Sequence, residues 1–254
     1  MKIKGIKKEG KKYKIILDTN EVIITNDQVI INNNLLYEKK LNNKLLEKIK
    51  EETYYYEIYN KILKMINHKI RSEHEIRKFI QKNDLSKEEN KMINQLKEIG
   101  LINDEQFAEA YTNDKINLSL DGPYKIQKEL EESQIDSLYI EKALSNFTQD
   151  LIDSKLNKII NKKINSNTKD TNYIFKQKTS LYLSNLGYSK EDITNHLDNI
   201  KLDNSKLERE MQKIYDKLKT KYEGYTLKNK LRQKLYQKGF TSEEIENFIK
   251  KTVH

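Results

Sequence analysis

The side chains best suited to chemistry in this sequence are cations and tyrosines near its C-terminal end. Between residues 217 and 238, eight Lys and Arg residues accompany a single acidic residue, Glu223. These eight residues, named the C-terminal basic patch, are Lys217, Lys219, Lys221, Lys228, Lys230, Arg232, Lys234 and Lys238. Three tyrosines lie among them, namely Tyr222, Tyr225 and Tyr236. Lysines neutralise phosphates and tyrosine rings stack on bases, so the patch could bind a single nucleic-acid strand.

Two plainer interpretations of the patch stay open. The chain is rich in Lys, Asn and Ile and has four arginines, a composition that an A/T-rich gene imposes, and lysine-rich helix faces are usually just solvated. Tyrosines at helical spacing are more often packing residues with a hydrated hydroxyl, and we expect packing for Tyr222, Tyr225 and Tyr236. The patch alone therefore does not decide between nucleic-acid contact and a solvated surface.

Patterns for catalysis and metal binding are weak throughout the chain. The histidines are His68, His74, His196 and His254. They show no paired metal-ligand spacing on one helical face, and the sequence has neither a glycine-rich phosphate loop nor a serine nucleophile elbow. Asp104 and Glu105 are neighbours that point apart on a helix, so helix capping explains them better than a carboxylate pair does. We therefore expect no enzyme activity, no metal and no cofactor.

The elements that must position the patch follow a repeating pattern. Leu130, Leu183 and Leu235 each begin the same spacing, with turn residues at offsets four and five and apolar residues at offsets ten and fourteen. The starts lie 53 and 52 residues apart. A degenerate fourth copy begins at Ile80, where asparagines occupy the later apolar offsets. Self-similarity with a period of this length is typical of repeat architectures, in which each unit packs on its neighbours.

Helix caps account for the spacing within each copy. Gly187 and Gly239 suit the left-handed C-cap position, where a β-carbon would be strained. Pairs with the spacing from N-cap to N3 begin the next helix, and these are Ser86 with Glu89, Ser189 with Asp192, Thr241 with Glu244, and, between copies, Asn103 with Gln106. Each copy therefore predicts three short helices.

The first forty residues obey a different period. Short β-branched runs occupy 2–6, 12–17, 21–24 and 28–31, with turn-forming Asp, Asn and Thr residues between them. These runs predict a small antiparallel sheet, and helical spacing begins at Leu41. No apolar run approaches about 18 residues, the first ten residues lack a signal-peptide core, and cysteine is absent, so we expect a soluble cytoplasmic protein.

The expected fold class is mainly α: an elongated tandem array of three-helix repeats with a small N-terminal β subdomain. One proline and seven glycines in 254 residues agree with helices joined by short turns. The predicted divisions are a β subdomain with a linking helix at 1–53 and helical repeats at 54–101, 102–150, 151–200 and 201–254.

Three segments carry a family resemblance. They are residues 75–80 (EIRKFI), 100–111 (GLINDEQFAEAY) and 122–130 (GPYKIQKEL), which is followed by Ile135, Ile140 and Leu144. In their order and nearly in their spacing they resemble the linked first and second repeats of the RecX family, whose members regulate the RecA recombinase. The match spans about 70–145, and the later repeats resemble longer members more loosely.

The resemblance implies a monomeric regulator that binds RecA as a filament on single-stranded DNA and, in most members, restrains it. The candidate contacts for RecA or DNA are the C-terminal basic patch together with Arg71, Arg77, Lys78, Tyr124, Lys125 and Lys128. Members commonly carry arginine at the positions of Tyr124 and Gln127 and glycine at that of Gln134. The second repeat of this chain therefore has less positive charge, which moves the expected main contact to the C-terminal basic patch.

The distribution of charge fits such a role. Lys and Arg against Asp and Glu number 12 and 8 in residues 1–53, 14 and 18 in 54–150, 9 and 5 in 151–202, and 13 and 8 in 203–254. The basic ends could meet DNA phosphates, and the acidic middle could meet basic surfaces of RecA. Two other classes stay open: a stand-alone DNA-binding protein of helix-turn-helix type, and a helical-repeat scaffold for an unrelated protein partner.

Overall fold

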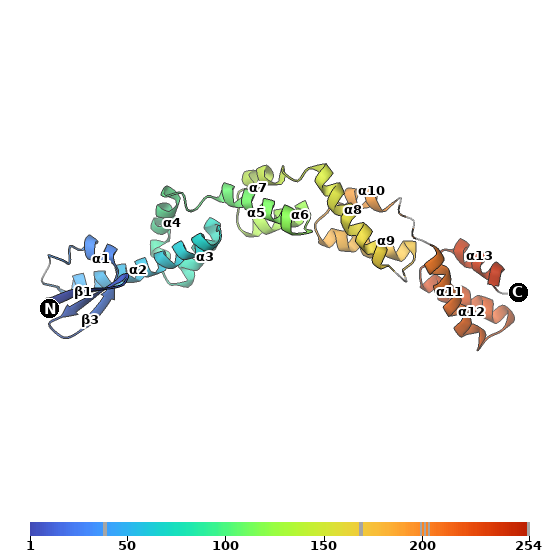
Figure 1. The fold of residues 1–254 in the computed structure, drawn as a ribbon, viewed down its shortest axis with the longest axis horizontal. Helices are drawn as coiled ribbons and strands as arrows, with labels where there is room; N and C mark the ends of the chain where they lie inside the picture. The colour runs from blue at the N-terminus through green and yellow to red at the C-terminus, as the bar shows by residue number, and fades with distance from the viewer. Residues whose placement is uncertain (38–39, 168–169, 199, 201, 203, 253–254) are drawn as a thin grey trace. The chain divides into compact units, whose positions relative to one another are not determined.

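The structure, a computed structural model, describes residues 1–37, 40–167, 170–198, 200, 202 and 204–252 (Figure 1). Helices follow a small three-stranded antiparallel sheet at the N-terminus, which confirms the predicted mainly α class. By their internal contacts the residues form two compact units. Unit 1 comprises Met1–Phe107 and Ser133–Ile135, and unit 2 comprises Ala108–Glu132 and Asp136–His254.

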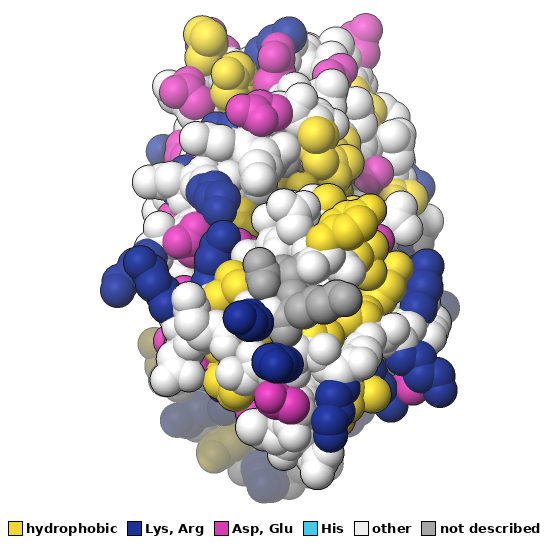
Figure 2. All heavy atoms as spheres, turned by 90° about the vertical axis from the view of Figure 1, so that its left-hand side faces the viewer, with side chains coloured by type: hydrophobic (Ala, Val, Ile, Leu, Met, Phe, Trp, Pro, Cys, Tyr) yellow, Lys and Arg dark blue, Asp and Glu magenta, His cyan; other side chains and the backbone are white. Residues whose placement is uncertain are grey.

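The sheet of unit 1 joins β1 (Ile3–Glu9), β2 (Lys12–Leu17) and β3 (Val22–Thr25) in the order β1-β2-β3. Alternate side chains point to opposite faces, so Ile15, Leu17 and Ile23 are buried while Ile16 and Val22 are exposed. Figure 2 looks onto this N-terminal end and shows exposed hydrophobic side chains together with many Lys and Arg side chains. The strands predicted at 2–6, 12–17 and 21–24 are confirmed.

The fourth predicted strand, at 28–31, is wrong. Residues Asp27–Asn32 form the helix α1, because the Asn26 side chain accepts a hydrogen bond from the Val29 N–H and caps the first turn. The helix buries the adjacent side chains Val29 and Ile30 together. A β-branched run alone therefore did not decide between strand and helix here, and the asparagine before it did.

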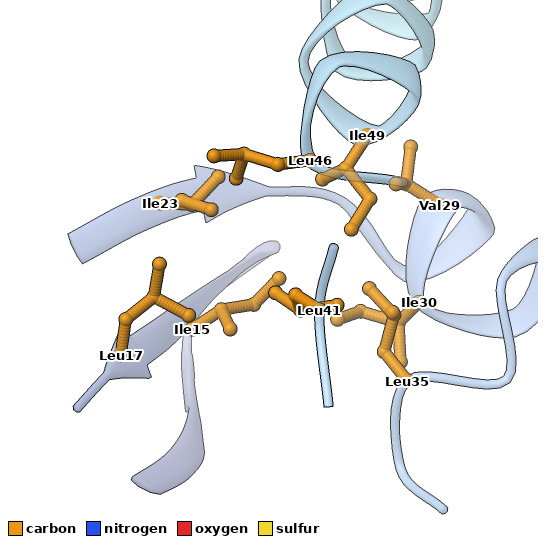
Figure 3. Close-up of a cluster of buried hydrophobic side chains, with 9 residues drawn as sticks. All are labelled: Ile15, Leu17, Ile23, Val29, Ile30, Leu35, Leu41, Leu46 and Ile49. Carbon is orange, nitrogen blue, oxygen red and sulfur yellow. The ribbon is translucent and has the colours of Figure 1, made fainter. Parts of the chain in front are cut away.

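The first core lies between the sheet and the start of α2 (Asn43–His68). In Figure 3, Ile15 from β2, Ile30 from α1 and Leu41 point into one space, which Ile49 of α2 helps to close. Full burial of such a side chain contributes about 1.5–3 kcal/mol each, so this cluster fixes the sheet on the helix. The helix continues past position 53, where a domain boundary was predicted, and that boundary stays a prediction.

The second core of unit 1 joins α2 to α3 (Glu73–Lys82), a 3₁₀ turn η1 (Ser86–Glu88) and α4 (Glu89–Glu98). The N-cap predicted at Ser86 is wrong, because this residue lies inside the 3₁₀ turn. The turn moves the apolar face of α4 two positions along, so Met92 and Leu96 are buried in place of Asn90 and Asn94. This shift explains why the first copy of the repeat looked degenerate.

The helices of the remaining chain form three consecutive sets of three. The first set is α5 (Asp104–Leu118), α6 (Pro123–Glu132) and α7 (Ser137–Leu144). The second set is α8 (Gln149–Ser166), α9 (Asn172–Asn185) and α10 (Lys190–Leu197). The third set is α11 (Asn204–Lys219), α12 (Gly224–Gln237) and α13 (Ser242–Thr252). Three helices per copy were predicted and are confirmed, while the predicted repeat boundaries themselves stay a prediction.

The turn between the second and third helix has the same backbone in every copy. Asp84, Gln134, Gly187 and Gly239 have φ of 57°, 55°, 86° and 84°, all in the left-handed region. The predicted caps at Ser189, Thr241 and Asn103 are present, since each side chain accepts an N–H three residues on. The repeating sequence pattern therefore records one recurring helix–turn–helix geometry. Among the described residues, the helices are too short or too polar to cross a bilayer.

Candidate nucleic-acid interface

The C-terminal basic patch lies on the third set of helices, which has its own core. Leu227, Leu231 and Leu235 of α12 are one turn apart and nearly fully buried against α11 and α13. With 3.6 residues per turn, this stripe leaves the rest of α12 facing away from the core. The packing of three leucines therefore decides where each cation of α12 points.

The lysines of α12 flank the leucine stripe. Lys230 and Lys234 are four residues apart on one flank, and Lys228 and Arg232 have the same spacing on the other. Lys230 and Lys234 are exposed, whereas Lys228 and Arg232 are half-buried. A strand crossing α12 could therefore meet two rows of positive charge with the outer face of the helix between them.

Most of the patch is free of carboxylate partners. Six residues have no ion pair within the part of the chain that the structure describes, and they are Lys217, Lys221, Lys228, Lys230, Lys234 and Lys238. Lys219 is different, because its Nζ lies 2.6 Å from Asp216 Oδ1. These six ammonium groups can pair with phosphates without breaking an existing ion pair.

Arg232 has a structural partner. Its Nε and Nη2 donate to the two carboxylate oxygens of Glu246 on α13, at 2.6 and 3.1 Å, and its Nη1 donates to Asn229 at 3.3 Å. The hydrogen bonds to Glu246 raise the pKa of the Arg232 guanidinium. This fork ties α12 to α13, so Arg232 is partly occupied in holding the third set together.

The three tyrosines of the patch behave differently from one another. Tyr222 packs half-buried against the core, as expected. The expectation is wrong for Tyr225 and Tyr236, which are 77% and 69% exposed. These two rings are eleven residues apart, three full turns plus about 20°, so they share the outer face of α12. Exposed rings between rows of lysines are suited to stacking on bases.

The candidate residues of unit 1 serve mainly to hold that unit together. Arg77 donates to Glu73 at 2.7 Å and to Glu89 at 2.5 Å, which joins α3 to α4. Arg71, which precedes α3, pairs with Glu75 in the first turn of that helix at 3.1 Å. Lys78 is exposed and has no ion-pair partner among the described residues. The structure therefore leaves Lys78 as the available cation of these three.

In α6 the available groups are at the surface. Tyr124 is 60% exposed, and Lys128 is exposed with its nearest carboxylate, Glu132, at 3.9 Å. Lys125 instead donates to Asp121 at 2.7 Å. Hence Lys125 belongs to the framework, while Tyr124 and Lys128 remain candidates for contact.

The framework at this place is a network around Asp121, which is 8% exposed. Its carboxylate accepts from Lys115 at 3.0 Å and from Lys125 at 2.7 Å. Burial raises the pKa of Asp121. The hydrogen bonds from the two lysines lower this pKa by more than burial raises it, so the pKa of Asp121 is lowered overall. Lys115 also pairs with Glu129 at 2.7 Å. The network fixes the Asp-Gly-Pro turn at the start of α6.

The same turn is the contact between the first and second sets of helices. The Gly122 N–H donates to Leu186 O at 2.6 Å and the Tyr124 N–H donates to Gly187 O at 3.0 Å. The Tyr188 hydroxyl donates to Leu120 O at 3.0 Å, and burial raises its pKa to about 12. A β-carbon on Gly187 would lie 2.3 Å from the Lys125 nitrogen. Glycine is thus required here both by its φ and by the neighbouring backbone.

Among the residues that the structure describes, no group of three or more His, Asp or Glu side chains is placed to hold a metal ion. His196 Nδ1 lies 2.8 Å from Asp192 O, a contact within its own helix, and His254 is outside the described residues. Asp104 accepts the Glu73 N–H at 2.8 Å, so it caps the first turn of α3, and burial raises its pKa. Asp104 therefore caps a neighbouring helix, a contact that the sequence did not reveal, while the cap of its own helix is Asn103.

Comparisons with known proteins agree with this architecture. The family model described as RecX, second three-helix domain, matches residues 103–144, and the one described as RecX, third three-helix domain, matches residues 203–249. "Regulatory protein RecX" of Oceanobacillus iheyensis is 26% identical over 96% of this chain and 94% of its own length. These matches support the assignment of the chain to the RecX family. The protein of the same name from Listeria innocua is 27% identical over 98% of this chain and 96% of its own length.

Solved RecX structures share the fold. A "Crystal structure of regulatory protein RecX" matches with a TM-score of 0.64 and 24% identity, over 78% of this chain and 99% of the other. A "Crystal structure of RecX from Lactobacillus salivarius" matches with a TM-score of 0.52 and 27% identity, over 58% and 98%. The two segments matched by RecX family models flank α8–α10, and the C-terminal basic patch lies within the second of them.

Proposed function

We propose that this RecX-family chain is a non-enzymatic regulator that binds RecA, assembled as a filament on single-stranded DNA, and restrains its ATPase and recombinase activity. Membership of a family of regulatory proteins supports the general role. The partner and the direction of regulation come from the family resemblance. The work would take place on chromosomal DNA in the cytoplasm, during recombination, repair and the SOS response, with the chain acting as a monomer.

The observation that carries the DNA part of the proposal is the state of the C-terminal basic patch. Six lysines without ion pairs among the described residues lie on the same set of helices as two exposed tyrosine rings. If about six phosphates are neutralised on a single strand, log K falls against log salt with a slope of about −4, from about 0.7 per contact. If the patch is only a solvated surface that contacts no DNA, the lysines should contribute no such dependence of affinity on salt.

The arrangement of helices supports binding to a filament over binding to a single protomer. Consecutive three-helix sets present separate surfaces, and weak contacts on a repeating partner add through effective concentration. Exposed acidic side chains of the first and second sets, such as Glu109, Glu132 and Glu191, could face basic surfaces of RecA. Restraint would follow if the bound chain blocked the second DNA strand or the protomer movements coupled to ATP hydrolysis.

The test is the ATPase rate of RecA preassembled on single-stranded DNA while this protein is titrated in. A three-site variant, K228E/K230E/K234E, removes charge from α12 but keeps Arg232, because Arg232 bridges to Glu246 and its reversal would disturb α13. The matched control is K44E/K82E/K87E, which makes the same change in net charge at exposed lysines of unit 1.

We expect the ATPase rate to fall at substoichiometric amounts of the wild type and of the control variant, and to fall less with K228E/K230E/K234E. Equal inhibition by all three proteins would remove the patch from the mechanism. An unchanged rate at saturating protein, together with no cosedimentation with the filament, would reject RecA as the partner. Tight binding to duplex DNA without RecA would favour a stand-alone DNA-binding protein.

A further inference from the structure

A second basic surface lies in unit 1, where two segments distant in sequence meet. The first fourteen residues contain seven lysines and one acidic residue, Glu9. More than forty residues later, α2 carries Lys61 and Lys64. The fold brings the tip of the β1–β2 hairpin over this part of α2, so Lys8, Lys11 and Lys12 line one groove together with Lys61 and Lys64.

The hairpin forms one wall of the groove. Ile6 pairs with Ile15 across the strands, and two residues further along Lys8 pairs with Tyr13. Because side chains two apart share a face, Lys8 and Tyr13 lie on the face that packs on the core, with Tyr13 partly buried at the edge of the core and Lys8 on the strand opposite it. Gly10, with φ 61°, closes the two-residue loop at the tip. The core-facing side of the sheet therefore ends in a polar, lysine-bearing extension.

The helix α2 forms the floor. Ile49, Thr53, Glu57 and Lys61 follow one another at intervals of four residues, so they lie along one face of the helix. Ile49 is in the core, and the Thr53 hydroxyl is 2.7 Å from that of Thr25 on β3. Beyond these contacts the same face continues into the groove. The floor is therefore held in register with the sheet by packed and hydrogen-bonded residues.

Among the described residues, one ion pair links the wall to the floor. Lys12 Nζ donates to Glu57 Oε1 at 3.1 Å, and both side chains remain substantially exposed. Lys11, Lys61 and Lys64 have no carboxylate partner within the described part of the chain. Their ammonium groups are therefore available for a ligand, at the tip of the hairpin and along the helix.

The groove has the size and charge of a site for a strand. Its volume is about 1210 Å³, and five lysines line it against two acidic residues, Asp27 and Glu57. Sites for small molecules usually measure about 300–1,000 Å³ and converge on a few polar groups, whereas these lysines are spread along both walls. Figure 2 shows Lys and Arg side chains gathered over the lower part of this end of the molecule, where acidic side chains are fewer. Leu63, Ile66 and Leu101 add apolar surface suited to sugars and bases.

We propose that this groove binds the sugar–phosphate backbone of a single nucleic-acid strand, with Lys11, Lys61 and Lys64 as the main phosphate contacts. A positively charged groove that follows the backbone, with apolar and aromatic surface beside it, is the usual arrangement for binding single strands without sequence preference. This site is separate from the C-terminal basic patch. It rests on the proposed function only for the expectation that the natural strand is DNA.

The experiment measures binding of the full-length protein, without RecA, to a fluorescein-labelled oligothymidine of about 20 nucleotides by fluorescence anisotropy. K228E/K230E/K234E is the background, so that the C-terminal basic patch does not dominate the signal. Onto it we place K11E/K61E/K64E, or K44E/K82E/K87E as the control with the same net charge. A third protein carries K11Q/K61Q/K64Q, which neutralises the groove without repulsion in case the reversed groove fails to fold.

We expect the groove substitutions to weaken binding about tenfold and to reduce the slope of log K against log salt by about 2, for three contacts of about 0.7 each. The control should keep the affinity and slope of the background. Equal losses of affinity in the groove variant and the control, or no loss of affinity with K11Q/K61Q/K64Q, would overturn the assignment. Polyglutamate that displaces the oligonucleotide as well as unlabelled oligothymidine does would show that an acidic protein surface is the better occupant. Because RecA is absent, failure here leaves the ATPase test of the proposed function untouched.

Discussion

The start of α6 and the length of α12 carry similar cations in similar helices, yet the structure uses them differently. At the start of α6, Lys125 of α6 and Lys115 of α5 both donate to the buried carboxylate of Asp121. At α12, Lys230 and Lys234 have no carboxylate partner among the described residues and are exposed. The partner of a lysine, more than its position in a repeat, therefore decides whether that lysine holds the fold together or is available to a ligand.

The energetics follow from this difference in partners. A phosphate that took Lys125 from Asp121 would leave a nearly buried carboxylate with one cation fewer, and uncompensated buried charge is costly. A phosphate that met Lys234 would displace only counterions and water. Mutations at α6 should therefore change stability first, and mutations at α12 should change binding first.

The largest expected effect comes from Gly187, on which the α6 contact is built. In Gly187→Ala a methyl group meets the Lys125 backbone at 2.3 Å, at a residue with φ 86°. Overpacking typically costs about 1–3 kcal/mol and a left-handed residue other than glycine about 1–2 kcal/mol, so we expect the free energy of unfolding to fall by about 3 kcal/mol. Urea denaturation followed by circular dichroism measures it.

Gly224→Ala is the matched control for backbone strain. Gly224 also has positive φ, 54°, but a β-carbon there would meet nothing within 4 Å. We expect a loss of about 1 kcal/mol from conformation alone. If Gly187→Ala costs no more than Gly224→Ala, the close approach of Gly187 to Lys125 contributes nothing to stability.

Much of this architecture was accessible from sequence because local rules and the fold agree. The spacing from Leu183 to Gly187 predicted a left-handed turn, and the turn is present. What the spacing could not predict is that Gly187 also meets the backbone of Lys125, sixty-two residues away, because no local pattern encodes a contact between sets of helices. The strand predicted at 28–31 failed for the opposite reason, since a local cap at Asn26 overruled the β-branched run.

The candidate interface was predictable in its charges but not in their availability. Counting lysines treated Arg232 and Lys234 alike, whereas the structure pairs Arg232 with Glu246 on another helix. Counting tyrosines favoured packing, whereas Tyr225 and Tyr236 project into solvent because the leucine stripe of α12 faces the other way. The sequence did not reveal the groove between the hairpin and α2, because its lysines come from two segments that are distant in sequence and meet only in the folded protein.

One lysine from each region, Lys125 and Lys234, should give the next largest effects. Lys125→Gln removes one of two cations from Asp121, and since Lys125 is itself 39% exposed we expect a modest loss of about 1 kcal/mol in the free energy of unfolding. Lys234→Gln should leave stability unchanged and reduce the salt slope of single-stranded DNA binding by about 0.7. Urea denaturation and fluorescence anisotropy measure the two quantities on both variants. A lower salt slope in Lys125→Gln, with stability intact, would reverse the roles that we assign.

The smallest expected effect is a dependence on pH at the α6 network. Although burial raises the pKa of Asp121, its two lysine partners lower it overall, below the ordinary value of about 3.9. A carboxyl group whose pKa is lower in the folded state contributes stability that is present above the unfolded pKa and is lost as pH falls through the folded pKa. The wild type should therefore be more stable than Asp121→Asn at neutral pH, and its thermal midpoint should fall more between about pH 5 and pH 3.

Asp114→Asn, at an exposed carboxylate of α5, is the control and should follow the wild type throughout. Parallel midpoints for Asp121→Asn and the wild type over this range would mean that the two lysines contribute no net stability, and the distinction between framework and interface lysines would then rest on the binding data alone.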